Sequence, residues 1–265
     1  MFAGSAYGFA CIRAVAPRGP GRQRRRLRLL GRAGLLDRGA VGWTGWPCRG
    51  EVASQVAVAA ALASFRHAPY ATAAGVVAAL HAANESLLAE QRRRPELASM
   101  RATLVVLAVD TRNALATWGH VGDTRLYCFR AHAVLLQTRD HSVVQAMVDA
   151  GYLAPERLRD SPHRNALLSA LGEAALPAPR IEAPLHVRDG DHFLLCTDGF
   201  WEYALEEDMA RGLAAGADPA TWLRRLEQLV RARGRPGQDN YSALAVACTD
   251  PCTTVLRSSS ARSVR

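Results

Sequence analysis

Apolar side chains recur at two different periods along this chain, and the change from one period to the other separates helices from strands. Residues 51–66 and 71–92 are rich in alanine and repeat their apolar positions at helical spacing, which predicts two helices. After residue 100 the period shortens to that of strands. Four short apolar segments then follow with brief polar breaks, a pattern typical of an antiparallel meander: residues 103–110, 114–121, 124–130 and 133–137.

The second half of the chain alternates again between the two patterns. Residues 141–150 predict a helix that Asp140 caps, and residues 153–165 are polar and contain proline, which predicts an irregular excursion. The pair Asp189-Gly190 lies between two apolar runs and predicts a tight hairpin turn. The last predicted elements are helices at residues 206–214 and 219–233 and a strand at residues 241–248. This order of elements favours a layered α+β fold over alternating βα units.

Three aspartates stand where predicted strands begin or end. Asp198-Gly199 follows an apolar strand and opens a helix, Asp123 separates two strands, and Asp239-Asn240 precedes the last strand. If these carboxylates meet at one edge of a sheet, they would suit Mg²⁺ or Mn²⁺ bound largely through water. Taken singly, each has a structural alternative as a turn residue, a helix N-cap or a loop pair.

The positive charge of the chain is confined to its first fifth. Residues 1–50 hold ten arginines and one acid, Asp37, which leaves 23 of the 33 basic and 23 of the 24 acidic residues for the rest of the chain. The remainder, in a chain of 265 residues that is 49% hydrophobic, is long enough for one large domain with a substantial core. These arginines suggest the hypothesis of an Arg-tailed nucleic-acid binder on an unrelated α+β core. No recognition fold surrounds them, however, and we expect no nucleic-acid partner.

Several other classes of protein lack support in the sequence. Six cysteines form no CxxC pair, which favours reduced thiols in the cytoplasm over disulfides or a zinc site. Apolar runs are too short for a membrane span, and the first residues do not resemble a secretory leader, so we expect a cytoplasmic protein without a membrane partner. Nucleotide-binding P-loop, esterase and zincin motifs are absent from the sequence.

Five motifs together carry a family resemblance. In order along the chain they are GHVGDTRLY (119–127), LLQTRDHSVVQAMVDAG (135–151), RNALLSALG (164–172), LLCTDGFWEY (194–203) and QDNYSALAV (238–246). In this order and spacing the chain resembles the metal-dependent, type-2C (PPM) serine/threonine protein phosphatases in a bacterial form, from about Glu51 to Cys248. The resemblance implies a four-layer αββα sandwich of two antiparallel sheets flanked by helices. It also implies an enzyme that hydrolyses phosphoserine and phosphothreonine in proteins with a metal-activated water.

The resemblance assigns roles to the acidic residues. It implies that Asp198 and Asp239 bind the paired Mg²⁺ or Mn²⁺ ions, that Asp198 also contacts a third ion, and that Asp123 is the other protein ligand of that third ion. Gly199 and Asn240 would support the metal site. Two such ions can lower the pKa of a bridging water and hold the phosphoryl oxygens during in-line attack.

The same resemblance implies partners and a mobile part of the site. The substrate would be a phosphorylated protein, and the enzyme would oppose a bacterial serine/threonine kinase in signal transduction. Residues 153–163 would form a flap over the cleft.

The family's first two motifs, an Asn-Glu-Asp segment and an Asp-Gly-Met-Gly-Gly segment, are missing. They supply further carboxylates and the Arg and His that meet phosphate, so we assign no catalytic residue. Trp43-Thr44-Gly45-Trp46 can be encoded by TGG ACG GGA TGG, which reads Asp-Gly-Met when translation starts two bases later. We therefore interpret residues 1–50 as an Arg-rich segment that is out of frame or disordered; a genuine divergent segment is the alternative.

These interpretations divide the chain into three parts. A phosphatase-like domain spans residues 51–250, between the Arg-rich segment 1–50 and a disordered tail at 251–265. Loss of the N-terminal ligands would impair this copy of the enzyme. The alternative function is a catalytically inactive phosphatase fold that binds phosphoproteins or regulates them.

Overall fold

The computed structural model describes residues 6–14, 28–34 and 49–249. Within the last range it omits residues 69–70, 112, 176–180, 182, 215, 217, 236–237 and 240, and it describes side chains only from residue 52 onward. Asn240, the tail at 251–265 and the tryptophans at 43 and 46 lie outside the described residues, so the predictions made for them stay predictions. The division of the chain near residue 50 also stays a prediction.

Two long helices form the first layer of the molecule. They are α1 (Arg49–His67) and α2 (Ala73–Arg93), and their bounds agree with the prediction to within two residues. The hydroxyl of Thr72 accepts the backbone N–H of Gly75 at 3.2 Å and caps the start of α2. A short 3-10 turn, Pro95–Leu97, then leads into the first strand of the meander region.

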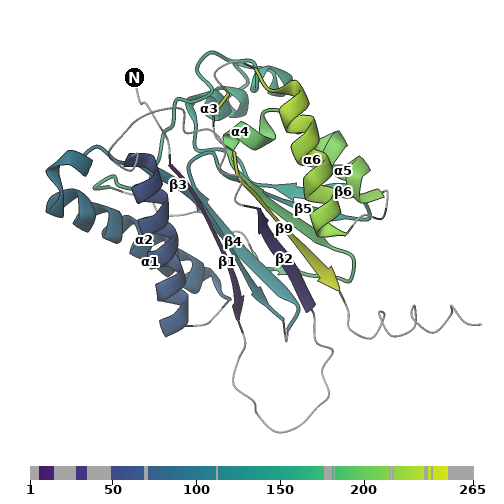
Figure 1. The fold of residues 1–265 in the computed structure, drawn as a ribbon, viewed down its shortest axis with the longest axis horizontal. Helices are drawn as coiled ribbons and strands as arrows, with labels where there is room; N and C mark the ends of the chain where they lie inside the picture. The colour runs from purple at the N-terminus through teal and green to yellow at the C-terminus, as the bar shows by residue number, and fades with distance from the viewer. Residues whose placement is uncertain are drawn as a thin grey trace, which may run out of the picture.

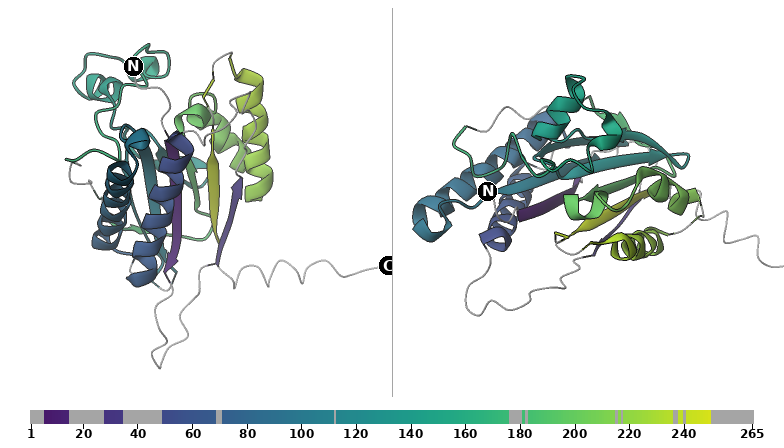
Figure 2. Two further views of the ribbon diagram at one scale, coloured as in Figure 1. Left: turned by 60° about the vertical axis from the view of Figure 1, so that its left-hand side comes forward. Right: turned by 90° about the horizontal axis from the view of Figure 1, so that it is seen from above.

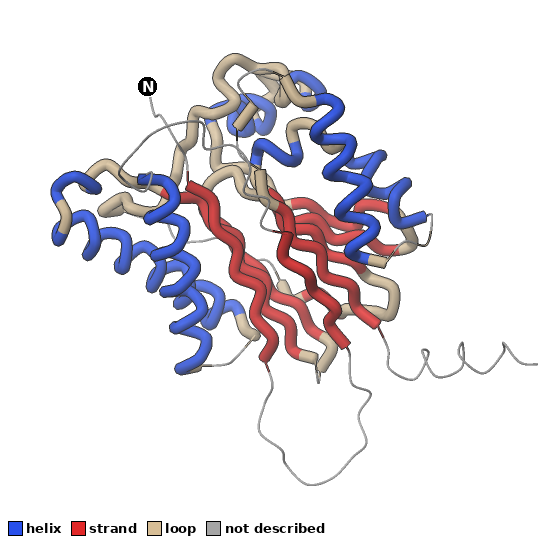
Figure 3. Tube along the Cα trace, viewed as in Figure 1, coloured by secondary structure: helices blue, strands red, loops and turns tan. Residues whose placement is uncertain are grey.

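Among the described residues, nine strands form two sheets that lie face to face between the helices (Figure 1, Figure 3). The first sheet contains β1 (Ala6–Ala14), β3 (Ala102–Asp110), β4 (Leu115–Val121) and β7 (Leu185–His186), in that order. The second contains β2 (Arg28–Gly34), β9 (Ala243–Thr249), β8 (His192–Cys196), β5 (Arg125–Arg130) and β6 (Ala133–Gln137), in that order. The described strands pair antiparallel, as expected, except that β1 runs parallel to β3. The sequence pattern did not predict β1 and β2.

The second helical layer covers the outer face of the second sheet. It contains α4 (Asp198–Trp201), α5 (Glu206–Ala214) and α6 (Pro219–Arg233), while α3 (Val143–Asp149) and the 3-10 turn Pro155–Arg157 precede them in the chain. The carboxylate of Asp218 accepts the N–H groups of Ala220 and Thr221 and fixes the start of α6. The bounds of α5 and α6 are those predicted.

Apolar side chains point alternately to the two faces of the strands, so each sheet packs against helices on one side and against the other sheet on the other, which gives four layers (Figure 2). On β3, Leu104 and Val106 pack against α1 and α2. Leu107 points the other way and packs in one cluster with Phe193 of the second sheet. The opposite side of the second sheet packs against Trp222 and its helical neighbours. The chain is therefore an α+β sandwich in the order helices, sheet, sheet, helices, as predicted. Among the described helices, none is both long and apolar enough for a transmembrane span.

Two predicted hairpins are wrong. Strands β4 and β5 do not pair, because the chain crosses from the first sheet to the second at Gly122-Asp123, so the predicted meander is two separate hairpins. Likewise β7 and β8, on either side of Asp189-Gly190, belong to different sheets. A period of two indicates a strand, but it does not indicate which sheet the strand joins. The crossing at Gly122-Asp123 places Asp123 at the edge where the two sheets meet.

Candidate metal centre

Asp123 lies in a tight bend between the two sheets. Gly122 adopts φ +96°, and a Cβ atom at that position would lie 2.2 Å from Cγ2 of Thr103. Only glycine fits this bend, because the backbone conformation disfavours side chains and the neighbouring strand leaves no space. The bend turns the carboxylate of Asp123 inward, where the side chain is 3% exposed.

Asp198 stands at the end of β8, as the sequence predicted. It is the first residue of the four-residue helix α4 and is 5% exposed. The backbone N–H of Gly199 donates to Oδ1 of Asp198 at 2.6 Å, which fixes one oxygen of the carboxylate. Thr197, not Asp198, occupies the N-cap position, so the alternative of Asp198 as a simple helix cap does not describe its geometry.

Asp123 and Asp198 lie close enough to interact electrostatically. Burial, the charge of Asp198 and, to a smaller extent, that of Asp140 raise the pKa of Asp123 well above its ordinary value. Oδ1 of Asp123 is buried, and among the described residues it has no hydrogen-bond partner. A buried carboxylate oxygen without a donor among the described residues, within electrostatic reach of a second carboxylate, is an arrangement that a bound cation would satisfy. The two residues therefore fit a hard divalent ion.

Asp239 reaches the same edge less directly. The side-chain N–H of Gln238 donates to the carbonyl of Gly199 at 3.0 Å, which joins the segment before β9 to α4. Asp239 itself is exposed. Among the residues that the structure describes, no three His, Cys, Asp or Glu side chains are grouped so that they could hold one metal ion. The structure thus brings Asp123 and Asp198 together, whereas the ligand role of Asp239 stays a prediction.

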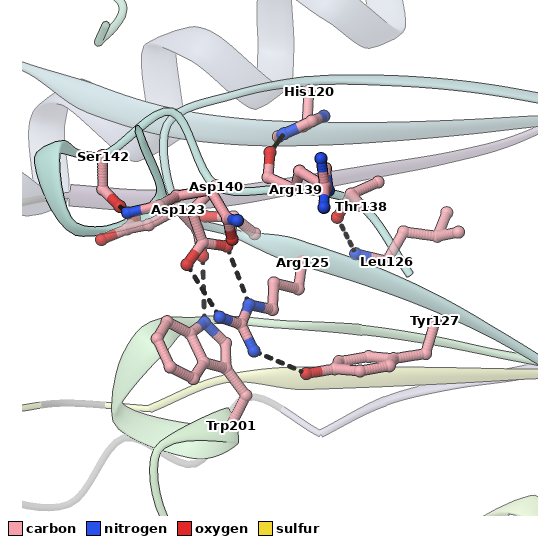
Figure 4. A network of polar contacts seen from close by, with 12 residues as sticks. His120, Asp123, Arg125, Leu126, Tyr127, Thr138, Arg139, Asp140, Ser142 and Trp201 are labelled. Carbon is pink, nitrogen blue, oxygen red and sulfur yellow. Dashed lines mark hydrogen bonds and ion pairs between the residues drawn. The ribbon is translucent and has the colours of Figure 1, made fainter. Parts of the chain in front are cut away.

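A buried arginine supports the bend of Asp123 (Figure 4). Nε and Nη2 of Arg125 donate to the two oxygens of Asp140 at 2.8 Å each, and Nη1 donates to the hydroxyl of Tyr127 at 3.1 Å. The guanidinium lies 3.5 Å from the ring centroid of Trp201. Burial alone would lower the pKa of Arg125, but Tyr127 and Asp140 keep it raised, so the group stays charged.

The sequence interpretation missed this network. Asp140 was predicted to cap a helix, but the cap is Ser142, whose hydroxyl accepts the N–H of Gln145 at 3.1 Å. The signal that could have revealed the pair is Arg125 itself. A charged side chain within an apolar strand needs a buried carboxylate nearby, and Asp140 follows the next strand in the chain.

Two histidines stack beside the bend. The rings of His120 and His141 lie 4.4 Å apart between centroids, with an angle of 18° between their planes. His120 contacts the carbonyl of Arg139 at 2.8 Å, and Nδ1 of His141 accepts the N–H of Gly122 at 3.3 Å. Burial and the neighbouring His141 lower the pKa of His120 to about 4. His141 therefore supports the backbone of the bend directly, and His120 stacks on His141.

Residues 153–163, the expected flap, contact α4 and α5 through Arg159. Nε of Arg159 donates to the carbonyl of Trp201 at 3.1 Å, and Nη2 donates to both oxygens of Glu206 at 2.8 Å. A recess of about 480 Å³ lies beside this contact. Its charged lining residues are Arg159, Asp160, Arg164, Glu202, Arg233 and Arg235, and Gln238 also contributes. The segment thus borders a polar recess next to α4.

Comparison with known proteins shows which families and proteins this chain resembles. The sequence model described as protein phosphatase 2C matches residues 44–240. The serine/threonine protein phosphatase PstP of Mycobacterium tuberculosis is 31% identical over 206 residues, which cover 76% of this chain and 38% of that protein. Protein phosphatase PhpP of Streptococcus pneumoniae is 32% identical over 100 residues, 38% of this chain and 39% of that protein. The matched region therefore spans about two fifths of the length of these curated relatives.

Solved structures agree with the fold. The crystal structure of the M. tuberculosis phosphatase PstP/Ppp superposes with a TM-score of 0.70 at 28% identity, over 84% of this chain and 98% of that one. The catalytic domain of PstP in complex with two manganese ions superposes with a TM-score of 0.69 at 27% identity, over 85% of this chain and 99% of that one.

Proposed function

The chain belongs to the protein phosphatase 2C family, and from this membership we propose that it hydrolyses phosphoserine and phosphothreonine in proteins with a metal-activated water. The observation that carries the proposal is the buried pair of Asp123 and Asp198, in which one carboxylate oxygen has no donor among the described residues.

The metal ligands that we propose are Asp198, Asp239 and Asp123, with Gly199 and Asn240 supporting them. Mg²⁺ or Mn²⁺ is the proposed ion, and the manganese-bound structure of PstP supports this choice. Divalent ions held there would lower the pKa of a coordinated water and neutralise charge on the phosphoryl oxygens.

The residues of the chain contribute position and charge. The N–H of Gly199 holds Oδ1 of Asp198 in one orientation, and the bend at Gly122 holds Asp123 toward it. Their combined negative charge opposes the binding of a phosphate anion unless cations are present. The dependence of activity on divalent ions follows directly from this arrangement.

We extend the proposal to partners and location. The substrate is a phosphorylated protein whose kinase is a bacterial serine/threonine kinase. Residues 153–163 act as the flap. The protein works in the cytoplasm, which is consistent with the buried, reduced thiols of Cys128 and Cys196. The names of the relatives, all phosphatases, do not favour the alternative of an inactive binding module.

Phosphate release from a phosphothreonine peptide tests the proposal. We expect release in Mn²⁺ and none in EDTA, and Asp198→Asn should lower the rate at least ~100-fold, because removal of one charged metal ligand weakens both ion binding and charge stabilisation. Asp208→Asn is a matched control: Asp208 is also buried but pairs with Arg233 on α6. This control should keep its Mn²⁺-dependent activity. Equal rates for wild type and Asp198→Asn would refute the metal assignment.

A further inference from the structure

Trp201 joins the two segments that carry the proposed metal ligands. It lies in α4, three residues after Asp198, and its indole N–H donates to the backbone carbonyl of Asp123 at 3.0 Å (Figure 4). This contact spans 78 residues of sequence and connects the bend between the sheets to the helix at the end of β8. The side chain is only 2% exposed, so water does not replace this donor.

The indole ring is itself held from both neighbouring elements. The guanidinium of Arg125 stacks on the ring at 3.5 Å from its centroid, and Arg125 is fixed in turn by its two bonds to Asp140. On the flap segment, the guanidinium of Arg159 lies 5.8 Å from the ring centroid, and its Nε donates to the backbone carbonyl of Trp201. A ring that is stacked and hydrogen-bonded in this way has one orientation, and it transmits that orientation to the carbonyl of Asp123.

We propose that Trp201 is a positioning residue that sets the separation of the Asp123 and Asp198 carboxylates and thereby the affinity of the ion between them. This inference rests on the proposed metal-binding function. The reason is geometric: a cation shared by two carboxylates is bound well only when both lie at the right distance, and groups behind the ligands fix that distance. Trp201 touches neither the ion nor the substrate; it acts through the backbone of Asp123.

Trp222 provides a matched control in the same layer of the molecule. It is fully buried, and its indole N–H also donates to a backbone carbonyl, that of Met209, at 3.0 Å. It packs against Phe129 in an edge-to-face arrangement, within the core between the second sheet and α5 and α6. Replacing either tryptophan with phenylalanine therefore removes the same hydrogen bond and similar apolar area, but only one of the two bonds reaches a proposed metal ligand.

The test measures binding of Mn²⁺ alone to the full chain, by the electron paramagnetic resonance signal of the free ion. Trp201→Phe should bind Mn²⁺ about 10-fold more weakly than wild type, whereas Trp222→Phe should stay within about 2-fold, since loss of a group behind a ligand typically weakens metal binding 10–100-fold. Urea unfolding of both variants should show similar losses of stability. If Trp201→Phe binds Mn²⁺ as tightly as wild type, or if Trp222→Phe weakens binding equally, Trp201 has no positioning role.

Two further arms separate the possible failures. A 3-benzothienylalanine residue at position 201 keeps the shape of the bicyclic ring but lacks the N–H, and it should reproduce the weaker binding even if the phenylalanine variant does not fold. Asp198→Asn should bind Mn²⁺ far more weakly than either tryptophan variant. If Asp198→Asn binds normally, the proposed metal site itself is wrong, and the role of Trp201 falls with it. If Asp198→Asn loses Mn²⁺ binding as expected but the variants at position 201 do not, only the positioning role of Trp201 is overturned.

Discussion

At the scale of single residues, the bend at Gly122-Asp123 carries part of the proposed metal centre. Asp123 is buried, and one of its oxygens has no hydrogen-bond partner among the described residues, which destabilises the metal-free protein, while the residues around it hold the bend in place. A site that binds a cation tightly must keep its carboxylates close together even though they repel one another. The local sequence meets this requirement with a glycine of positive φ, a stacked histidine pair and an indole N–H.

Substitution of Gly122 by alanine should destabilise the protein strongly. The new methyl group would meet Thr103 at 2.2 Å, and φ is +96°. Backbone strain and overpacking together predict a loss of about 2–4 kcal/mol in unfolding free energy, measured with urea. Gly151→Ala is the control, because Gly151 also has a positive φ but no atom within 4 Å of a new Cβ. Its loss should be about 1 kcal/mol. Equal losses at the two positions would contradict the close packing of the bend.

His120 predicts a pH dependence of the metal-free protein. Its folded-state pKa of about 4 lies below the ordinary value of 6.5, so the unfolded chain takes up a proton first as the pH falls. The contribution of neutral His120 to stability is thus complete above pH 6.5 and is lost as the pH falls toward 4. Urea unfolding in EDTA at pH 7.5 and pH 5 should show a smaller loss for His120→Gln than for wild type. An identical loss in both proteins would mean that His120 is not held neutral.

At the scale of elements, the ion pair between β5 and the segment before α3 joins the metal centre to the second sheet. Arg125 is 3% exposed and Asp140 is 2% exposed by side chain, so neither charge is solvated. Removal of one partner would leave the other charge buried without compensation. Asp140→Asn should therefore lower the unfolding free energy by about 3–5 kcal/mol.

An exposed ion pair on α2 provides the contrast. Arg93 and Glu90 lie 2.8 Å apart, but the arginine side chain is 70% exposed. Arg93→Gln should change the unfolding free energy by less than about 1 kcal/mol in the same urea experiment. A loss for Asp140→Asn as small as that for Arg93→Gln would show that the buried pair does not hold the elements together.

The sequence predicted the elements better than their pairing. Helices such as α2 and α6 and strands such as β6 follow from apolar periodicity and caps, which are local signals. The assignment of β4 and β5 to different sheets could not be predicted, because it depends on the conformation of Gly122 and on packing across the sandwich. Asp123 and Asp198 were predicted as site residues from their places at strand ends. Arg125 and Trp201 were missed, since their roles arise from contacts between distant segments.

At the scale of the whole molecule, the match to phosphatases and the first fifty residues disagree. The helices and the two sheets have the arrangement of the family, but the first two family motifs do not occur in the sequence. We propose that an out-of-frame segment explains this disagreement. We expect the coding DNA to spell Asp-Gly-Met in another frame above residues 43–46. Sequencing of the 5′ part of the gene checks this, and a gene without that alternative reading would leave a divergent N-terminal segment as the explanation.

Crystals grown with Mn²⁺ and measured at the manganese absorption edge test the central claim most directly. The anomalous difference map should show manganese in contact with the carboxylate of Asp198, with one ion also close to Asp123 and one close to Asp239. Manganese bound elsewhere, or Asp123 and Asp198 with separate environments and no shared ion, would contradict a metal-dependent phosphatase centre at this edge of the sandwich.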